Sequence, residues 1–243
     1  MSKMPNLSRF CSIGIALGAI LPFTALANRY VDAGVPAIDK TWSATDYLDA
    51  YTAIKRGSLP LPMLDEPDGA AVLRSMSSKS NLDFLRNPEI PLGTRLDGGR
   101  QIALSATNFL MQYEESKRQK QRGHSESAML SAFMLRLNAL PLELKEQQAK
   151  TTEPKEDLGR MKAGLLRSLE GVAGQLTGAP LYSDAALTAL LDAMDDVTAV
   201  HAIRFTQEER ATLNRGLERA QVVIPKAHQP KVEKIRNLLG KPG

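Results

Sequence analysis

The chain has 243 residues, of which 43% are hydrophobic and 24% charged, and its formal net charge is +4 at pH 7. This length suits one domain or two small ones, with a core large enough to fold without disulfides. The single cysteine excludes a disulfide framework and a thiolate zinc site, while the small net charge and few aromatic residues argue against a nucleic-acid partner.

Residues 1–27 have the composition of a cleavable secretory signal peptide. Lys3 and Arg9 give the start of this segment a positive charge with no acidic residue, and the following residues 11–23 are apolar. A membrane-spanning helix needs about 20 apolar residues, so this run, which also contains Pro22, is too short to be an anchor. We therefore expect the segment to direct export and then to be removed.

Small residues follow the apolar run, as a signal peptidase site requires. Ala25 and Ala27 occupy the −3 and −1 positions of an A-x-A site, so cleavage is expected to leave Asn28 as the new N-terminus. Cys11 comes at the start of the apolar run, whereas a lipidated cysteine would follow that run, so lipidation is not expected. Removing this leader also removes two cations, which lowers the net charge from +4 to +2. The resulting cysteine-free chain fits a periplasmic or secreted bacterial protein.

Residues 28–100 are expected to form an irregular segment, rich in proline and glycine, that packs on a larger bundle. Pro60 and Pro62 forbid helix and favour an extended chain around them. The prolines and glycines of Asn87–Arg100 predict a loop, which marks a possible boundary. Apolar residues at helical spacing predict three short helices, at Ser43–Arg56, Pro67–Ser77 and Ser80–Asn87.

Residues 101–243 are expected to form the bundle itself. Gln101–Arg122 carries apolar residues on two faces, which predicts a central position between neighbours. Pro141 is expected to break or kink the chain after the next helix, and Thr206 opens a capping box. The other predicted helices are Ser125–Leu140, Pro154–Leu176, Ser183–Ile203, Thr206–Val223 and Val232–Leu239. The pattern predicts an all-α bundle of antiparallel helices, with a curved α-solenoid as the alternative.

Three aspartates form the most conspicuous cluster of possible metal ligands. Asp192, Asp195 and Asp196 are spaced i, i+3 and i+4, so they share one face of a helix, as in all-α enzymes that hold magnesium. No second acidic cluster accompanies them. The helix places them roughly opposite its apolar stripe, which indicates a solvated surface, and we expect no metal and no cofactor here.

His201 lies on the apolar stripe of the same predicted helix. A lone histidine in that position is typical of a core residue whose ring nitrogens are hydrogen-bonded, not of a metal ligand. The other histidines, His124 and His228, fall in predicted loops, and no HExxH motif is present. A zinc site is therefore not expected.

The last predicted helix has an apolar edge surrounded by lysine and arginine. Two interpretations fit: an amphipathic segment on an anionic membrane, or a short helix docked on the bundle. Membrane affinity grows with buried apolar area, and this edge has four aliphatic side chains and no aromatic one, so docking is the prediction. Its apolar residues are Val232, Ile235, Leu238 and Leu239.

No stretch of the sequence carries a specific catalytic motif. We therefore expect a non-enzymatic helical protein of the bacterial envelope that binds or stabilises a protein or envelope component. The alternative is an exported enzyme whose carboxylates and arginines come together from distant positions in the chain.

Overall fold

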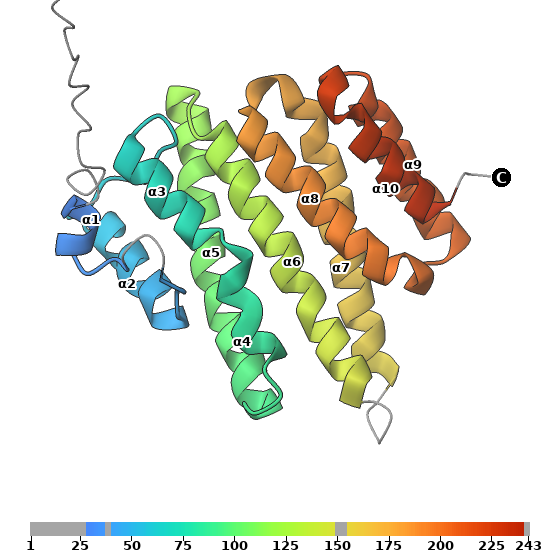
Figure 1. Cartoon of the computed structure of the whole chain (residues 1–243), viewed down its shortest axis with the longest axis horizontal. Helices are drawn as coiled ribbons and strands as arrows, with labels where there is room; N and C mark the ends of the chain where they lie inside the picture. The colour runs from blue at the N-terminus through green and yellow to red at the C-terminus, as the bar shows by residue number, and fades with distance from the viewer. Residues whose placement is uncertain (1–27, 37–39, 149–154, 241–243) are drawn as a thin grey trace, which may run out of the picture.

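The computed structural model describes residues 28–36, 40–148 and 155–240, which form an all-α multi-helix bundle (Figure 1). The expected signal peptide, with Ala25 and Ala27, lies outside these residues, and Asn28 is the first residue of α1. The helices are α1 (Asn28–Asp32), α2 (Ala44–Lys55), α3 (Pro67–Met76), α4 (Asp83–Arg86), α5 (Leu92–Lys120), α6 (His124–Gln148), α7 (Lys155–Gln175), α8 (Asp184–His201), α9 (Gln207–Gln221) and α10 (Gln229–Leu239). Short 3₁₀ turns link several of them, including η2 (Lys79–Leu82) before α4.

The centre of the bundle is α6, not α5 as the sequence predicts. It packs against α5, α7 and α8, and Figure 1 shows it crossing the middle of the molecule between them. Side chains are buried almost all around α6, which is the pattern of a helix with neighbours on every side. On α5, by contrast, Leu104 and Met111 are 62% and 53% exposed, so its second apolar face has no neighbour among the described residues.

The starts of α2 and α9 follow the local sequence. The Ser43 and Thr206 side chains each accept a hydrogen bond from the third helical residue, and the backbone amides of these two caps donate to the carboxylates of Asp46 and Glu209. These capping boxes satisfy amide groups that a helix end would leave unpaired. The predicted capping box at Thr206 is confirmed.

The loop prediction for Asn87–Arg100 holds only as far as Pro91, because α5 begins at Leu92 and continues through the glycines of that segment. Gly99 allows α4 to approach closely: a Cβ at this position would lie 3.0 Å from the Leu85 side chain. The Arg95 guanidinium also donates a hydrogen bond to the Leu85 carbonyl oxygen at 3.0 Å. This carbonyl group near the end of α4 therefore has a partner. Tertiary packing thus stabilises helix where local propensity opposes it.

Of the two outcomes expected at Pro141, a break or a kink, the break does not occur. The helix runs from His124 to Gln148 with Pro141 inside it. Proline removes one backbone hydrogen bond, but the side chains on either side, Leu140 and Leu142, are both almost fully buried. We attribute the continuity of the helix to this packing.

The docking prediction for the last helix is confirmed. α10 packs against α8 and α9, and the side chains of Val232 and Ile235 are fully buried. Leu238, at the end of the same helix, remains 38% exposed. No helix in the described part of the chain is long and apolar enough to cross a membrane.

Candidate functional site

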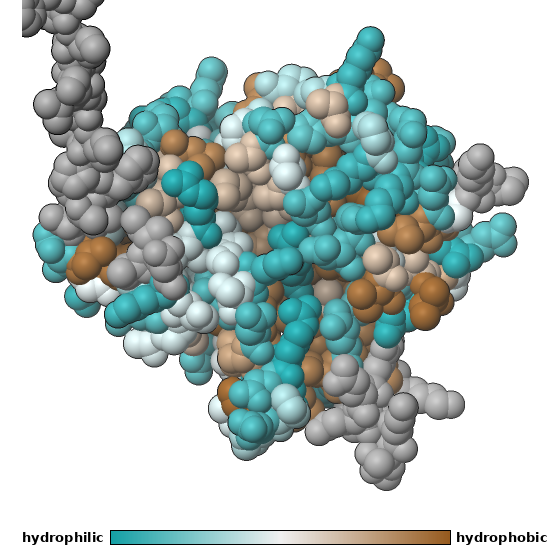
Figure 2. All heavy atoms as spheres, in the orientation of Figure 1, coloured by the Kyte–Doolittle hydropathy of each residue, from teal (hydrophilic) through white to brown (hydrophobic). Residues whose placement is uncertain are grey.

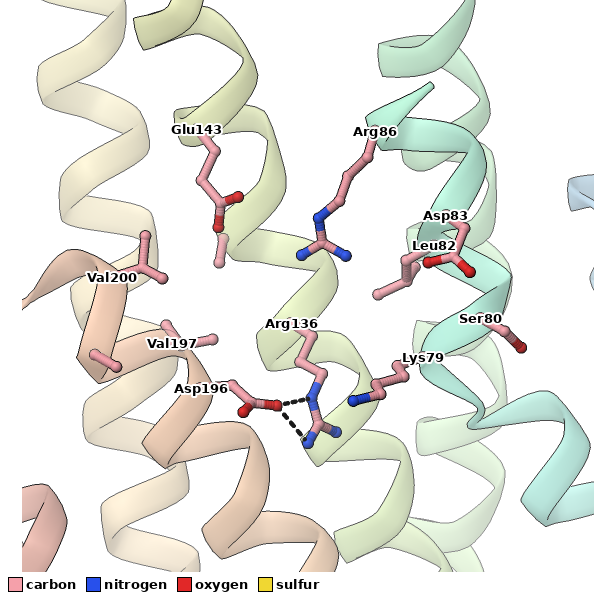
Figure 3. Close-up of a pocket in the computed structure, with 12 residues that line it drawn as sticks. Lys79, Ser80, Leu82, Asp83, Arg86, Arg136, Glu143, Asp196, Val197 and Val200 are labelled. Atoms are coloured by element: carbon pink, nitrogen blue, oxygen red, sulfur yellow. Dashed lines mark hydrogen bonds and ion pairs between the residues drawn. The ribbon is translucent and has the colours of Figure 1, made fainter. Parts of the chain in front are cut away.

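A hollow of about 590 Å³ opens between the η2 and α4 segment on one side and α6 and α8 on the other. Figure 3 shows the side chains that line it, and Figure 2 shows hydrophilic and apolar side chains intermixed on this face of the molecule. The lining comes from three regions that are far apart in the sequence. Its residues are Lys79, Ser80, Leu82, Asp83, Arg86, Arg136, Ala139, Glu143, Asp196, Val197, Ala199 and Val200.

A buried asparagine holds the η2 wall of the hollow in place. The side-chain oxygen of Asn81 accepts from the Trp42 amide at 2.9 Å, and its amide nitrogen donates to the Tyr47 hydroxyl at 3.0 Å and to the Ser75 carbonyl oxygen at 2.8 Å. The Tyr47 ring stacks on Phe133 of α6, with centroids 5.9 Å apart. This network ties the segment that carries the basic side chains of the wall to the central helix.

The Tyr47 hydroxyl stays protonated within this network. Burial raises its pKa well above the usual value of 10, although the hydrogen bond from Asn81 opposes that shift. The protonated hydroxyl donates to the Met76 carbonyl oxygen while it accepts from Asn81. Each polar group at this buried junction therefore has a partner.

Arg136 and Asp196 form the floor of the hollow. The Nε and Nη2 atoms of Arg136 on α6 both lie 3.0 Å from Oδ2 of Asp196 on α8, as the dashed lines of Figure 3 show. The Arg136 side chain is 17% exposed, so its position is fixed by α6 and α8 together with this ion pair. Arg136 is not among the residues predicted from the sequence, although a lone cation in the otherwise apolar middle of a helix is a recognisable signal.

Glu143 lines the same hollow, and His201 is a buried residue that contacts Glu143. Nε2 of the fully buried His201 is 3.2 Å from Oε1 of Glu143, whose side chain is 22% exposed. The expected burial of His201 is confirmed, but the expected hydrogen bonds at both ring nitrogens are not, because Nδ1 has no hydrogen-bond partner among the described residues. The Glu143 carboxylate is thus already engaged by a neighbour.

The prediction of a solvated face holds for Asp192 and Asp196, whose side chains are 41% and 53% exposed, and is wrong for Asp195. Asp192 pairs with Lys231, and Asp195 pairs with Lys234 at 2.5 Å, so both aspartates face α10 while Asp196 turns toward α6. The Asp195 side chain is 14% exposed. A helical wheel assigns one buried face, but α8 has neighbours on two sides, and the second neighbour is a helix with a basic edge.

Two carboxyl groups with shifted pKa values lie outside the hollow. Burial alone would raise the pKa of Glu114, but hydrogen bonds from Lys117 and Ser127 outweigh it and lower that pKa below 4.5. At Glu209 burial is likewise outweighed, by the hydrogen bond from Lys162 and those at the Thr206 cap, and the pKa is again lowered. Both shifts are consequences of pairing that stabilises the fold.

These geometries are independent of any resemblance to a known protein. No family model, curated protein or solved structure matches the chain. In the ranges that the structure describes, no three His, Cys, Asp or Glu side chains lie close enough together to hold a metal ion. The arrangement of the hollow therefore carries the functional argument.

The hollow includes residues that sequence reasoning missed. Of the predicted candidates, Asp196 lines it and His201 contacts its wall through Glu143, while Asp192 and Asp195 lie away toward α10. Lys79 and Arg86 are on a short, exposed segment whose orientation depends on the fold. Nothing in the local sequence indicates that they lie near Arg136 in the folded chain.

Proposed function

We propose that this chain is an exported, non-enzymatic protein of the bacterial envelope, and that the hollow between α4, α6 and α8 binds a protein or envelope component. The support for export is the order of parts in residues 1–27: cations, an apolar run and an A-x-A site. The support for binding is that some charged groups in the hollow form ion pairs and others do not.

The observation that carries the binding proposal is a contrast between carboxylates and cations. Two of the three lining carboxylates are paired, Asp196 with Arg136 and Glu143 with His201, while Asp83 is exposed and forms no ion pair with Lys79 or Arg86. Lys79 and Arg86 are exposed, and neither forms a hydrogen bond or ion pair within the described parts of the chain. A general acid or base must be free to exchange a proton with substrate, whereas a recognition site needs unpaired charge, so this contrast favours binding.

The alternative, an enzyme, has one observation in its favour. Glu143, Asp196, Arg136 and Arg86 are carboxylates and arginines that the fold assembles from distant positions. If they were catalytic, Glu143→Gln would abolish turnover of a substrate and leave its binding intact. In a binding site the same substitution changes affinity, and no chemical conversion of the ligand accompanies it.

Export is tested by the intact mass of the protein recovered from outside the cytoplasm. We expect a mass that begins at Asn28, because cleavage should follow Ala27. A mass equal to that of the full chain, or one increased by acyl groups, would overturn the proposed localisation.

Binding is tested by capture of envelope components on the immobilised protein. We expect a component that the wild type retains and that the Lys79→Glu, Arg86→Glu double variant loses, because these cations are the unpaired groups of the hollow. A matched control exchanges the same charges at Arg74 and Arg219, which are exposed residues outside the lining. Equal capture by the wild type and both double variants would contradict the proposal.

A further inference from the structure

The three cations of the hollow approach it from three different elements. Lys79 comes from η2, Arg86 from α4 and Arg136 from α6. In Figure 3 the Lys79 ammonium points toward the Arg136 guanidinium, and the Arg86 guanidinium extends over the space between α4 and α6. Like charges placed this way repel one another, so an anion between them would be stabilised.

The acidic residues of the lining compensate this cationic corner only in part. Arg136 is the partner of Asp196, and His201 is the partner of Glu143. Asp83 also lines the hollow, but the structure has no ion pair between it and either Lys79 or Arg86. The lining charges sum to zero, but of the groups without an ion pair in the described part of the chain two are cations, Lys79 and Arg86, and one is a carboxylate, Asp83.

The chemistry of these two groups selects the anion. The planar guanidinium of Arg86 can donate two parallel hydrogen bonds to a carboxylate or a phosphate, and the Lys79 ammonium adds a compact charge. The rest of the lining is largely aliphatic, with Leu82, Ala139, Val197 and Val200 among its members. A volume of about 590 Å³ is within the range of small-molecule sites.

We propose that the hollow is the binding site for an amphiphilic anion, whose carboxylate or phosphate head lies between Lys79 and Arg86 and whose apolar body lies against Ala199 and Val200, the exposed apolar residues of the lining. This assignment rests on the proposed function, because it names the chemical class of the envelope ligand. Arg136 adds little net charge at the floor, because Asp196 neutralises it. The head is recognised by charge, and the body by burial of apolar surface.

The test is calorimetric titration of the purified chain with four probes: octanoate, octyl phosphate, octanol and inorganic phosphate. We expect octanoate or octyl phosphate to bind at least about tenfold more tightly than octanol or inorganic phosphate, because each weaker probe lacks either the charge or the apolar body. The stronger of the two amphiphiles identifies the head group. Binding should also weaken as salt concentration rises.

The Lys79→Gln, Arg86→Gln variant should lose about tenfold or more of the affinity for the amphiphilic anions and keep its octanol affinity. Both side chains are exposed, so the melting temperature should not change, and Arg74→Gln, Arg219→Gln is the matched control. Equal binding of octanol and the anions, or undiminished binding by the Lys79 and Arg86 variant, would overturn the assignment. If no probe binds while charge-dependent capture of an envelope component persists, the amphiphilic anion is wrong and the proposed function stands.

Discussion

A single buried polar residue, Asn81, holds the basic wall of the hollow in place. Asn81 is fully buried and connects the backbone at Trp42, the Tyr47 hydroxyl and the end of α3. Its neighbour in the chain, Leu82, belongs to the lining, as does Lys79 two residues earlier. The orientation of the basic wall therefore depends on an interior hydrogen-bond network.

Replacing Asn81 with alanine should lower the free energy of unfolding by about 2 kcal/mol, because it leaves buried donors and acceptors without partners. Urea unfolding measures this change. Ser80→Ala is the control: its side chain is exposed and bonds only to Ser78 among the described residues, so we expect a change below about 0.5 kcal/mol. Equal effects at the two positions would contradict the role of the network.

A second prediction at the scale of single residues concerns the aspartates of α8. Asp195→Asn should lower the free energy of unfolding by about 1 kcal/mol, since the Asp195 side chain is 14% exposed and faces Lys234 of α10. Asp49→Asn, on an exposed site of α2, should have an effect below about 0.5 kcal/mol. Thermal melting of the two variants compares them, and an unchanged Asp195→Asn protein would restore the solvated-face interpretation.

At the scale of whole elements, α10 is part of the bundle. Ile235→Ala should lower the free energy of unfolding by about 2–4 kcal/mol, because the Ile235 side chain is fully buried. Leu238→Ala removes a partly exposed side chain of similar size and should have a much smaller effect. Urea unfolding distinguishes the two.

The same interpretation predicts how removing α10 affects stability and membrane binding. Deleting residues 232–243 should lower the melting temperature and leave binding to anionic liposomes at background, since the apolar edge of α10 faces α8 and α9. A deletion that leaves stability unchanged and abolishes liposome binding would show instead that α10 is a membrane-binding surface.

The elements also show which features a sequence can predict. The Thr206 capping box depends on contacts three residues apart, so it can be predicted from the local sequence. The start of α5 depends on close packing of Gly99 against Leu85. The groups of the hollow, such as Arg86 and Arg136, meet through tertiary packing alone, so spacing along the chain does not reveal them.

For the whole molecule, ion pairs at helix ends and between helices predict a dependence of stability on pH. The lowered pKa values of Glu114 and Glu209 mean that their contribution is complete above about pH 4.5 and is lost as pH falls through the lowered values. The difference in unfolding free energy between wild type and the Glu114→Gln, Glu209→Gln variant should therefore shrink between pH 6 and pH 3, as urea titrations would show. A difference that stays constant over this range would contradict the pairing at these two sites.

The central claim is that the hollow between α4, α6 and α8 binds an envelope ligand. Its most direct test places a photoreactive residue at Ser80, on the rim of the hollow, and at Thr107, on the exposed surface of α5, in living cells. Mass spectrometry should find a discrete adduct from position 80 that disappears in the Lys79→Glu, Arg86→Glu background and is missing from position 107. The same adducts from both positions, or an adduct from position 80 that persists without these cations, would contradict the claim.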